Sequence, residues 1–71
     1  MSMEIKAPMT GKIISIAVHK GDKINADDEV IIMDAMKMEI PVCAPEGGTV
    51  KEIKVKEGDS VKTDQVLMVL E

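Results

Sequence analysis

The chain contains no phenylalanine, tyrosine, tryptophan or arginine, and its 71 residues include one cysteine and one histidine. Nine lysines stand against thirteen acids, which gives a net charge of -4. A mildly acidic chain without aromatic rings lacks both the basic footprint and the stacking platforms that nucleic-acid binding uses. No apolar run approaches the roughly 20 residues that span a bilayer. We therefore expect no nucleic-acid partner and no insertion into a membrane.

The scarcity of cysteine and histidine also argues against catalysis. The lone Cys43 can form no internal disulfide, and nothing at the N-terminus resembles a signal peptide, so we expect a cytoplasmic location. We interpret Cys43 as a small apolar filler of a strand and His19 as an exposed residue at a strand end. Neither has a partner at catalytic or metal-ligand spacing. The sequence thus indicates a non-catalytic domain with a core of Val, Ile, Leu, Met and Ala.

The most informative feature is an internal repeat, because residues 44–71 match residues 7–34 without a gap at an offset of 37 positions. The matched positions are glycines, prolines, acids and apolar residues. They are Ala7-Pro8 with Ala44-Pro45, Gly11 with Gly48, Gly21-Asp22 with Gly58-Asp59, Asp27 with Asp64, and Val30–Met33 with Leu67–Leu70. Each copy is too short to bury its apolar face alone. We therefore predict one domain over residues 1–71, in which two copies share a core with pseudo-two-fold symmetry.

Each copy has the pattern of short strands separated by turns. Ala-Pro favours an extended start, because a residue before proline avoids the helical region. Turns are predicted at Gly11, Gly47-Gly48, Lys20–Asp22, Glu57–Asp59, Asp27 and Asp64, where glycine or aspartate tolerates the required backbone. Strands are predicted around Ile24 and Val61, over Val30–Met33, Ile40–Cys43 and Val66–Leu70, and, with period-two alternation, over Ile53–Lys56. Apolar parity breaks between Val50 and Ile53, which indicates a bulge or a strand end there.

One alternative is a helix over Asp27–Glu39, which holds an aspartate cap and several good helix formers. Two features oppose it. The repeat partner of its first part, Asp64–Glu71, is rich in β-forming Val and Leu, and Pro41 follows too soon for a helix to continue. We therefore predict an all-β fold. Four lysines of the second copy are expected on its solvated outer face, namely Lys51, Lys54, Lys56 and Lys62.

The link between the copies, residues 35–39, is predicted to be the tip of a hairpin. Pseudo-symmetry places it at the pole opposite the two termini. Tight hairpins favour Asn, Asp or Gly at the centre, where φ is positive, yet the centre here is Met36-Lys37. Exposed methionines add nothing to folding and suit a surface that another protein contacts. This tip therefore indicates side chains that an outside enzyme reads, with Lys37 at their centre.

Ala35-Met36-Lys37-Met38 resembles the attachment motif of biotin carboxyl carrier domains, and the resemblance extends from Ala7 to Glu71. It implies a flattened antiparallel barrel or sandwich of two four-stranded sheets. It further implies biotin on the ε-amine of Lys37, attached by a biotin protein ligase that reads the neighbouring residues. These neighbours are Asp34, Ala35, Met36, Met38 and Glu39. Asp34 departs from the glutamate that is frequent there, and the gapless repeat leaves no room for the thumb-like insertion of some carriers.

The resemblance also implies a role and partners. A biotin carboxylase would load a carboxyl group, with ATP and bicarbonate, and the carrier would deliver it to a carboxyltransferase, or run in reverse with a decarboxylase. A lipoyl carrier is the first alternative, but lipoyl domains usually have an acid before the lysine and a small residue after it. An unmodified interaction module of the same fold is the second. A free-standing enzyme has no activated nucleophile or phosphate loop in its favour.

Overall fold

The computed structural model describes residues 2–71, which form strands, turns and no helix. The strands are β1 (Met3–Lys6), β2 (Gly11–Ile16), β3 (Lys23–Ile24), β4 (Glu29–Ala35), β5 (Met38–Cys43), β6 (Gly48–Ile53), β7 (Ser60–Val61) and β8 (Val66–Leu70). They pair antiparallel in two four-stranded sheets. We name the sheet β1-β8-β6-β3 the terminal sheet and the sheet β5-β4-β2-β7 the hairpin sheet. The predicted all-β fold is confirmed, and β4 and β5 occupy the segment of the alternative helix.

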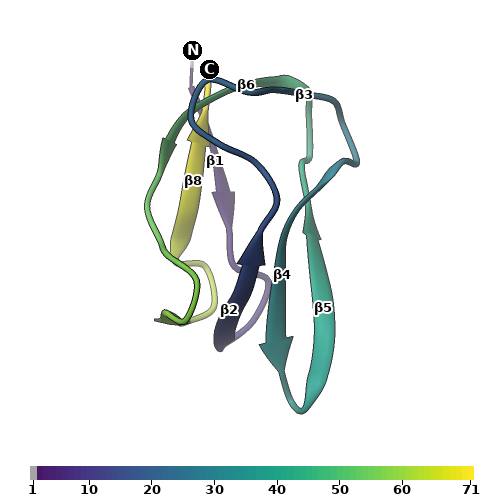
Figure 1. Ribbon diagram of the computed structural model, residues 1–71, viewed down its shortest axis with the longest axis vertical. Helices are drawn as coiled ribbons and strands as arrows, with labels where there is room; N and C mark the ends of the chain where they lie inside the picture. Colours follow the sequence, from purple (N-terminus) through teal and green to yellow (C-terminus); the bar gives the residue numbers. More distant parts are fainter. Residues whose placement is uncertain (1) are drawn as a thin grey trace.

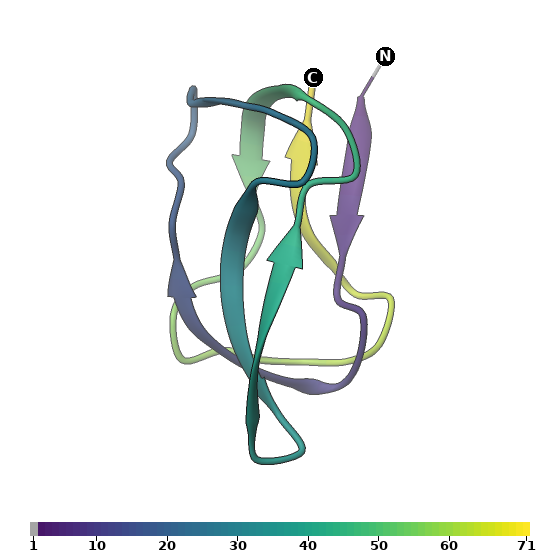
Figure 2. The ribbon, with the colours of Figure 1, turned by 90° about the vertical axis from the view of Figure 1, so that its right-hand side faces the viewer.

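The molecule is elongated, with extents of 33 × 17 × 17 Å. Both ends of the chain lie at one pole, and the turn between β4 and β5 lies at the other (Figures 1 and 2). In Figure 1 this turn extends below the neighbouring strands. The expected separation of the termini from the hairpin tip is therefore observed.

The core lies between the two sheets and contains only apolar side chains among residues 2–71. Its largest fully buried members come from both copies, and they are Ile13, Ile31, Met33, Leu67, Met68 and Leu70. Without aromatic rings, branched aliphatic and thioether side chains fill this space, as the composition predicts. Because β4 carries Val30, Ile31 and Met33 in that core, the base of the hairpin is anchored where its tip projects.

The 37-residue repeat is also a repeat of hydrogen bonds between the copies. The Ala7 amide donates to Gln65 at 2.9 Å, and the Ala44 amide donates to Asp28 at 2.8 Å. Gly21 donates to Val50 at 2.8 Å in the same way that Gly58 donates to Ile13 at 2.7 Å. Each bond joins one copy to the other, so neither copy completes its backbone pairing alone. This exchange is the physical form of the predicted pseudo-two-fold symmetry.

The predicted alternating strand over Ile53–Lys56 is placed wrongly, because β6 spans Gly48–Ile53. The alternation itself persists, since Val55 is buried and both flanking lysines are exposed. After Ile53 one further backbone hydrogen bond joins the chain to β8, from the Lys54 amide to Leu67 at 2.8 Å, before the chain leaves to form β7 in the hairpin sheet. Val55 therefore faces inward outside any strand. The predicted irregularity is confirmed as a register shift between Val50 and Glu52, and β2 has the equivalent shift between Ile13 and Ser15.

The glycines divide into two kinds. Gly21 and Gly58 adopt φ of 95° and 94°, as the predicted turns require, and Asp27 and Asp64 follow with 70° and 68°. Gly11 instead begins β2 and Gly48 begins β6, so the turns predicted at Gly11 and at Gly47-Gly48 are wrong. A Cβ on Gly11 would lie 2.5 Å from the Asp34 carbonyl oxygen, and the missing side chain therefore permits a close approach of β2 to the hairpin.

Candidate functional site

The candidate site is the hairpin of β4 and β5, whose loop consists of two residues. Asp34 pairs with Glu39 and Ala35 with Met38, so the ladder continues to the last residue before the turn. The link predicted as residues 35–39 is therefore shorter, and its centre is Met36-Lys37 as expected. Strand pairing on both sides fixes the position of the tip.

The tip has a strained backbone. Met36 has φ of 54° and Lys37 has φ of 65°. Positive φ at both central residues is the geometry of a type I′ turn, which matches the twist of the flanking strands and strongly prefers Asn-Gly. A left-handed conformation costs a residue with a Cβ about 1–2 kcal/mol. The sequence thus places two costly residues where cheaper ones would fold, which indicates a role for the side chains.

Those side chains are presented to solvent. Met36 is 81% exposed and Met38 is 65% exposed, which makes them the two most exposed large apolar residues among residues 2–71. Lys37 is exposed between them and takes part in no ion pair within that part of the chain. A primary amine at the end of a flexible side chain is thereby accessible from several directions.

Two acids and one small residue complete the hairpin. Asp34 and Glu39 lie opposite each other on the outer side of β4 and β5, and both are exposed. Ala35 is 2% exposed and faces inward, where its Cβ would lie 3.1 Å from a Cβ built on Gly11. Asp34 and Glu39 are thus available to an approaching protein, whereas Ala35 belongs to the packing between β2 and the hairpin.

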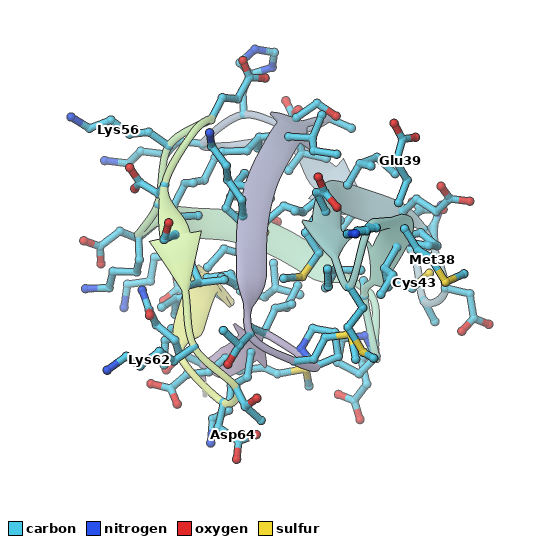
Figure 3. All side chains as sticks on the ribbon, turned by 90° about the horizontal axis from the view of Figure 1, so that it is seen from below. Met38, Glu39, Cys43, Lys56, Lys62 and Asp64 are labelled. Carbon is cyan, nitrogen blue, oxygen red and sulfur yellow. The ribbon has the colours of Figure 1, made fainter. Side chains whose placement is uncertain are left out.

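The remaining sequence candidates are not at the tip. Cys43 is exposed at the end of β5, so its interpretation as a buried filler is wrong. Its parity explains this, since Val42 points inward and the next residue of a strand points outward. His19 is exposed, as expected, with its backbone amide donating to Asp22 at 2.8 Å. Figure 3, seen from the hairpin pole, shows Met38, Glu39 and Cys43 on one flank and Lys62 and Asp64 on another.

The four lysines expected on the outer face of the second copy are all exposed.

Within residues 2–71 no group of three or more His, Cys, Asp or Glu side chains could hold a metal ion. Nor does that part of the chain contain a helix long and apolar enough to cross a membrane. An open hollow of about 500 Å³ lies where β4 ends and β2 and β7 begin, lined by Gly11, Lys12, Asp34 and Ser60 among others.

The fold is therefore a two-sheet domain whose hairpin holds one lysine side chain in solvent, away from the termini. The sequence model of the biotin/lipoyl family, described as "Biotin-requiring enzyme", matches residues 1–70. The chain belongs to this family. The fold predicted from the family resemblance is thereby supported by sequence and by structure.

Individual relatives agree with the family. The chain is 36% identical over 44 residues to "Biotinylated protein TB7.3 homolog" of Mycolicibacterium smegmatis, which covers 62% of each protein. It is 50% identical over 38 residues to "Glutaconyl-CoA decarboxylase subunit gamma" of Acidaminococcus fermentans, which covers 54% of this chain and 26% of that subunit. Among solved structures, Kluyveromyces lactis urea carboxylase matches the whole chain with a TM-score of 0.94 and 32% identity, over 6% of its own length. The chain thus spans less than two thirds of each of these proteins.

Proposed function

We propose that this chain is a biotin carrier domain, formed by residues 1–71, with biotin attached through an amide to Nζ of Lys37. The observation that carries the proposal is the exposed Lys37 between exposed Met36 and Met38, at a turn whose positive φ disfavours both Met36 and Lys37. Membership of the biotin/lipoyl family supports covalent attachment of biotin at this lysine. The methionine on either side favours biotin over lipoate.

The residues present fit the group. Lys37 is exposed and takes part in no ion pair among residues 2–71, so its amine can be acylated without breaking an ion pair. A biotin protein ligase would join this amine to the carboxyl group of biotin and release AMP and pyrophosphate from ATP. When bound, biotin supplies a nitrogen that accepts and donates a carboxyl group, while the protein supplies attachment and transport.

The rest of the hairpin has supporting roles in this proposal. Met36 and Met38 offer adaptable contacts to the ligase, and Asp34 and Glu39 add negative charge beside them. Because Ala35 is buried, it would act through packing, by allowing β2 to approach the hairpin closely. The short loop keeps Lys37 at a fixed height above the sheet, so the tethered group would sweep a defined volume and gain effective concentration at nearby active sites.

The partners would be the enzymes that load and unload the carrier. The named relatives include a decarboxylase subunit and the matched solved structure is a carboxylase. We therefore propose a biotin carboxylase and a carboxyltransferase or decarboxylase as partners in the cytoplasm, and a non-catalytic role for this chain. Both termini lie at the pole opposite the turn between β4 and β5 (Figure 1), and this arrangement would leave the turn free to enter other active sites.

The test is the intact mass of the protein after incubation with biotin, ATP and a biotin protein ligase, followed by peptide mapping. We expect a mass increase of one biotinyl group, located on the peptide that contains Lys37. Lys37→Arg is the matched control, because it keeps the charge and the remaining lysines but offers no acylatable amine. An increase in the Lys37→Arg protein would refute the site. No increase in the wild type would direct the same assay to lipoate and a lipoyl ligase.

A further inference from the structure

The two sheets carry different chemistry on their outer faces, although the repeat relates them position by position. At the bulge of the terminal sheet Lys51 pairs with Glu71, with 3.9 Å between Nζ and Oε1. The equivalent residues of the hairpin sheet, 37 positions away, are Ile14 and Asp34. A lysine is thus replaced by isoleucine, and Asp34 takes part in no ion pair within residues 2–71.

A second ion pair is lost in the same way. Lys54 and Glu52 on the terminal sheet lie 3.2 Å apart between Nζ and Oε1, and their equivalents are Ala17 and Ser15. The edge strands show the same difference, because the outward residues of β1 are Glu4 and Lys6 whereas those of β5 are Pro41 and Cys43. The outer face of the hairpin sheet therefore lacks the charge at five of these six equivalent positions, and Asp34 alone keeps it.

The result is an apolar strip beside the hairpin. Ile14 is the third large apolar residue exposed among residues 2–71, at 40%, after the two methionines of the tip. Half-buried Ile32 lies opposite Pro41 on β5 and opposite Ser15 on β2. Ile14 precedes Ser15 at the register shift of β2, so Ile14, Ile32 and Pro41 belong to the three neighbouring strands β2, β4 and β5. We name these three residues the apolar strip.

At the hairpin end, the strip is followed by negative charge. Asp34 and Glu39 are direct cross-strand neighbours on the same face, and like charges in that relation are destabilising. Lys12 is opposite Asp34 on β2 but forms no ion pair with it within residues 2–71. An apolar strip with two adjacent acids that form no ion pair among residues 2–71 is complementary to a protein surface that has an apolar side chain next to a basic one.

We propose that the outer face of the hairpin sheet is the surface on which the biotin protein ligase docks, with the apolar strip at the centre and Asp34 and Glu39 at the end next to Lys37. This inference rests on the proposed function. The ligase is the occupant because it acts on the unmodified lysine, whose amine extends from the hairpin only by the length of the lysine side chain. Such an enzyme must contact the protein around the tip, whereas enzymes that act on a biotinylated lysine work at the end of a longer arm. The strip is continuous with that tip through β4 and β5.

The test measures kcat/KM of a purified biotin protein ligase on variants that copy one sheet onto the other. Ile14→Lys installs the residue that Lys51 provides at the equivalent bulge, so the fold already accommodates it. Lys51→Ile is the reverse change on the terminal sheet and serves as the matched control. We expect Ile14→Lys to lower kcat/KM about tenfold, the effect of losing one central interface residue, and Lys51→Ile to leave it unchanged.

Ser15→Glu, which copies Glu52, is a second and independent variant, and thermal unfolding monitors the fold of all three proteins. A lower kcat/KM for Ser15→Glu with the fold retained supports the docking surface even if Ile14→Lys unfolds. Wild-type rates for every hairpin-sheet variant that folds would overturn the docking surface and leave the carrier function intact. Equal losses in Ile14→Lys and Lys51→Ile would also overturn it. A wild-type protein that acquires no biotin would overturn the proposed function and, with it, this inference.

Discussion

The turn at Met36-Lys37 should trade stability for function, and the trade can be measured by replacing both residues with Asn-Gly. Both residues have positive φ, at 54° and 65°. Each such residue with a Cβ costs about 1–2 kcal/mol, and glycine avoids the cost while asparagine reduces it. Glycine adds back about 0.5–1 kcal/mol through its greater freedom in the unfolded chain. The double variant should therefore be more stable than the wild type by about 1 kcal/mol.

A gain of that size corresponds to a rise in Tm of about 4–8 °C for a domain of this length. The chain has no aromatic residue, so intrinsic fluorescence cannot report unfolding, and far-UV circular dichroism or calorimetry is the suitable assay. Asp64→Asn is the matched control. Asp64 also has positive φ, at 68°, but aspartate tolerates this conformation, so the replacement should change the unfolding free energy by less than about 0.5 kcal/mol.

The double variant lacks the lysine at position 37 and should acquire no biotin from the ligase. A stable variant that cannot be modified would show that the wild-type residues are retained for function at the expense of folding. If the Asn-Gly protein unfolds at the same temperature as the wild type or below it, the backbone of the tip is not strained and the structural argument for Met36 and Lys37 as functional residues fails.

Three further predictions follow from packing and charge. Gly11→Ala should destabilise the fold by about 1–3 kcal/mol, because the new Cβ would lie 2.5 Å from the Asp34 carbonyl oxygen. Gly48→Ala is the control and should cost less, because the nearest atom to its new Cβ is 3.2 Å away. Equal shifts of the urea midpoint for the two variants would contradict this prediction. Leu67→Ala, at a fully buried position, should cost about 2–5 kcal/mol, and a wild-type midpoint would place Leu67 outside the core. Amide formation at Lys37 removes one positive charge from a chain of net charge -4, so biotinylated protein should migrate faster toward the anode on a native gel.

Much of the fold could be predicted because the sequence signal for each turn occurs in both copies of the repeat. One Gly-Asp pair is a weak signal, but Gly21-Asp22 and Gly58-Asp59 at matching places are strong, and both adopt the expected turn. The ends of the strands were harder to predict. Val55 has the alternation of a strand residue but lies beyond β6, because the partner strand is no longer alongside. Periodicity reports which side of the chain faces the core, and it does not report whether a neighbouring strand is present to pair with it.

The candidate site could be predicted in outline, and the errors at its margins have physical causes. Lys37 and its methionines are conspicuous because they occupy a turn that does not suit them. Cys43 was assigned to the core because free cysteine is usually buried. In β5 its neighbour Val42 is buried, so the Cys43 side chain points to the opposite, solvent-facing side of the strand. Ile14 went unnoticed as a functional candidate because an isoleucine in a strand is expected to be buried. Its exposure depends on the bulge in β2, which the sequence indicated only through the parity break of the second copy, between Val50 and Ile53.

The two copies provide a control that most proteins lack. Where equivalent residues agree, as at Gly21 and Gly58, the fold demands that residue type, since both places need the same backbone. Where they differ, as at Ile14 and Lys51, the fold accepts either, because both copies adopt the same bulge. The residue type at such a position must therefore be determined by something other than the fold. The hairpin sheet has exchanged ion pairs for an apolar strip on the face that adjoins Lys37, and exposed surface ion pairs contribute little to stability. The difference between the sheets is thus better explained by a partner at the hairpin than by folding.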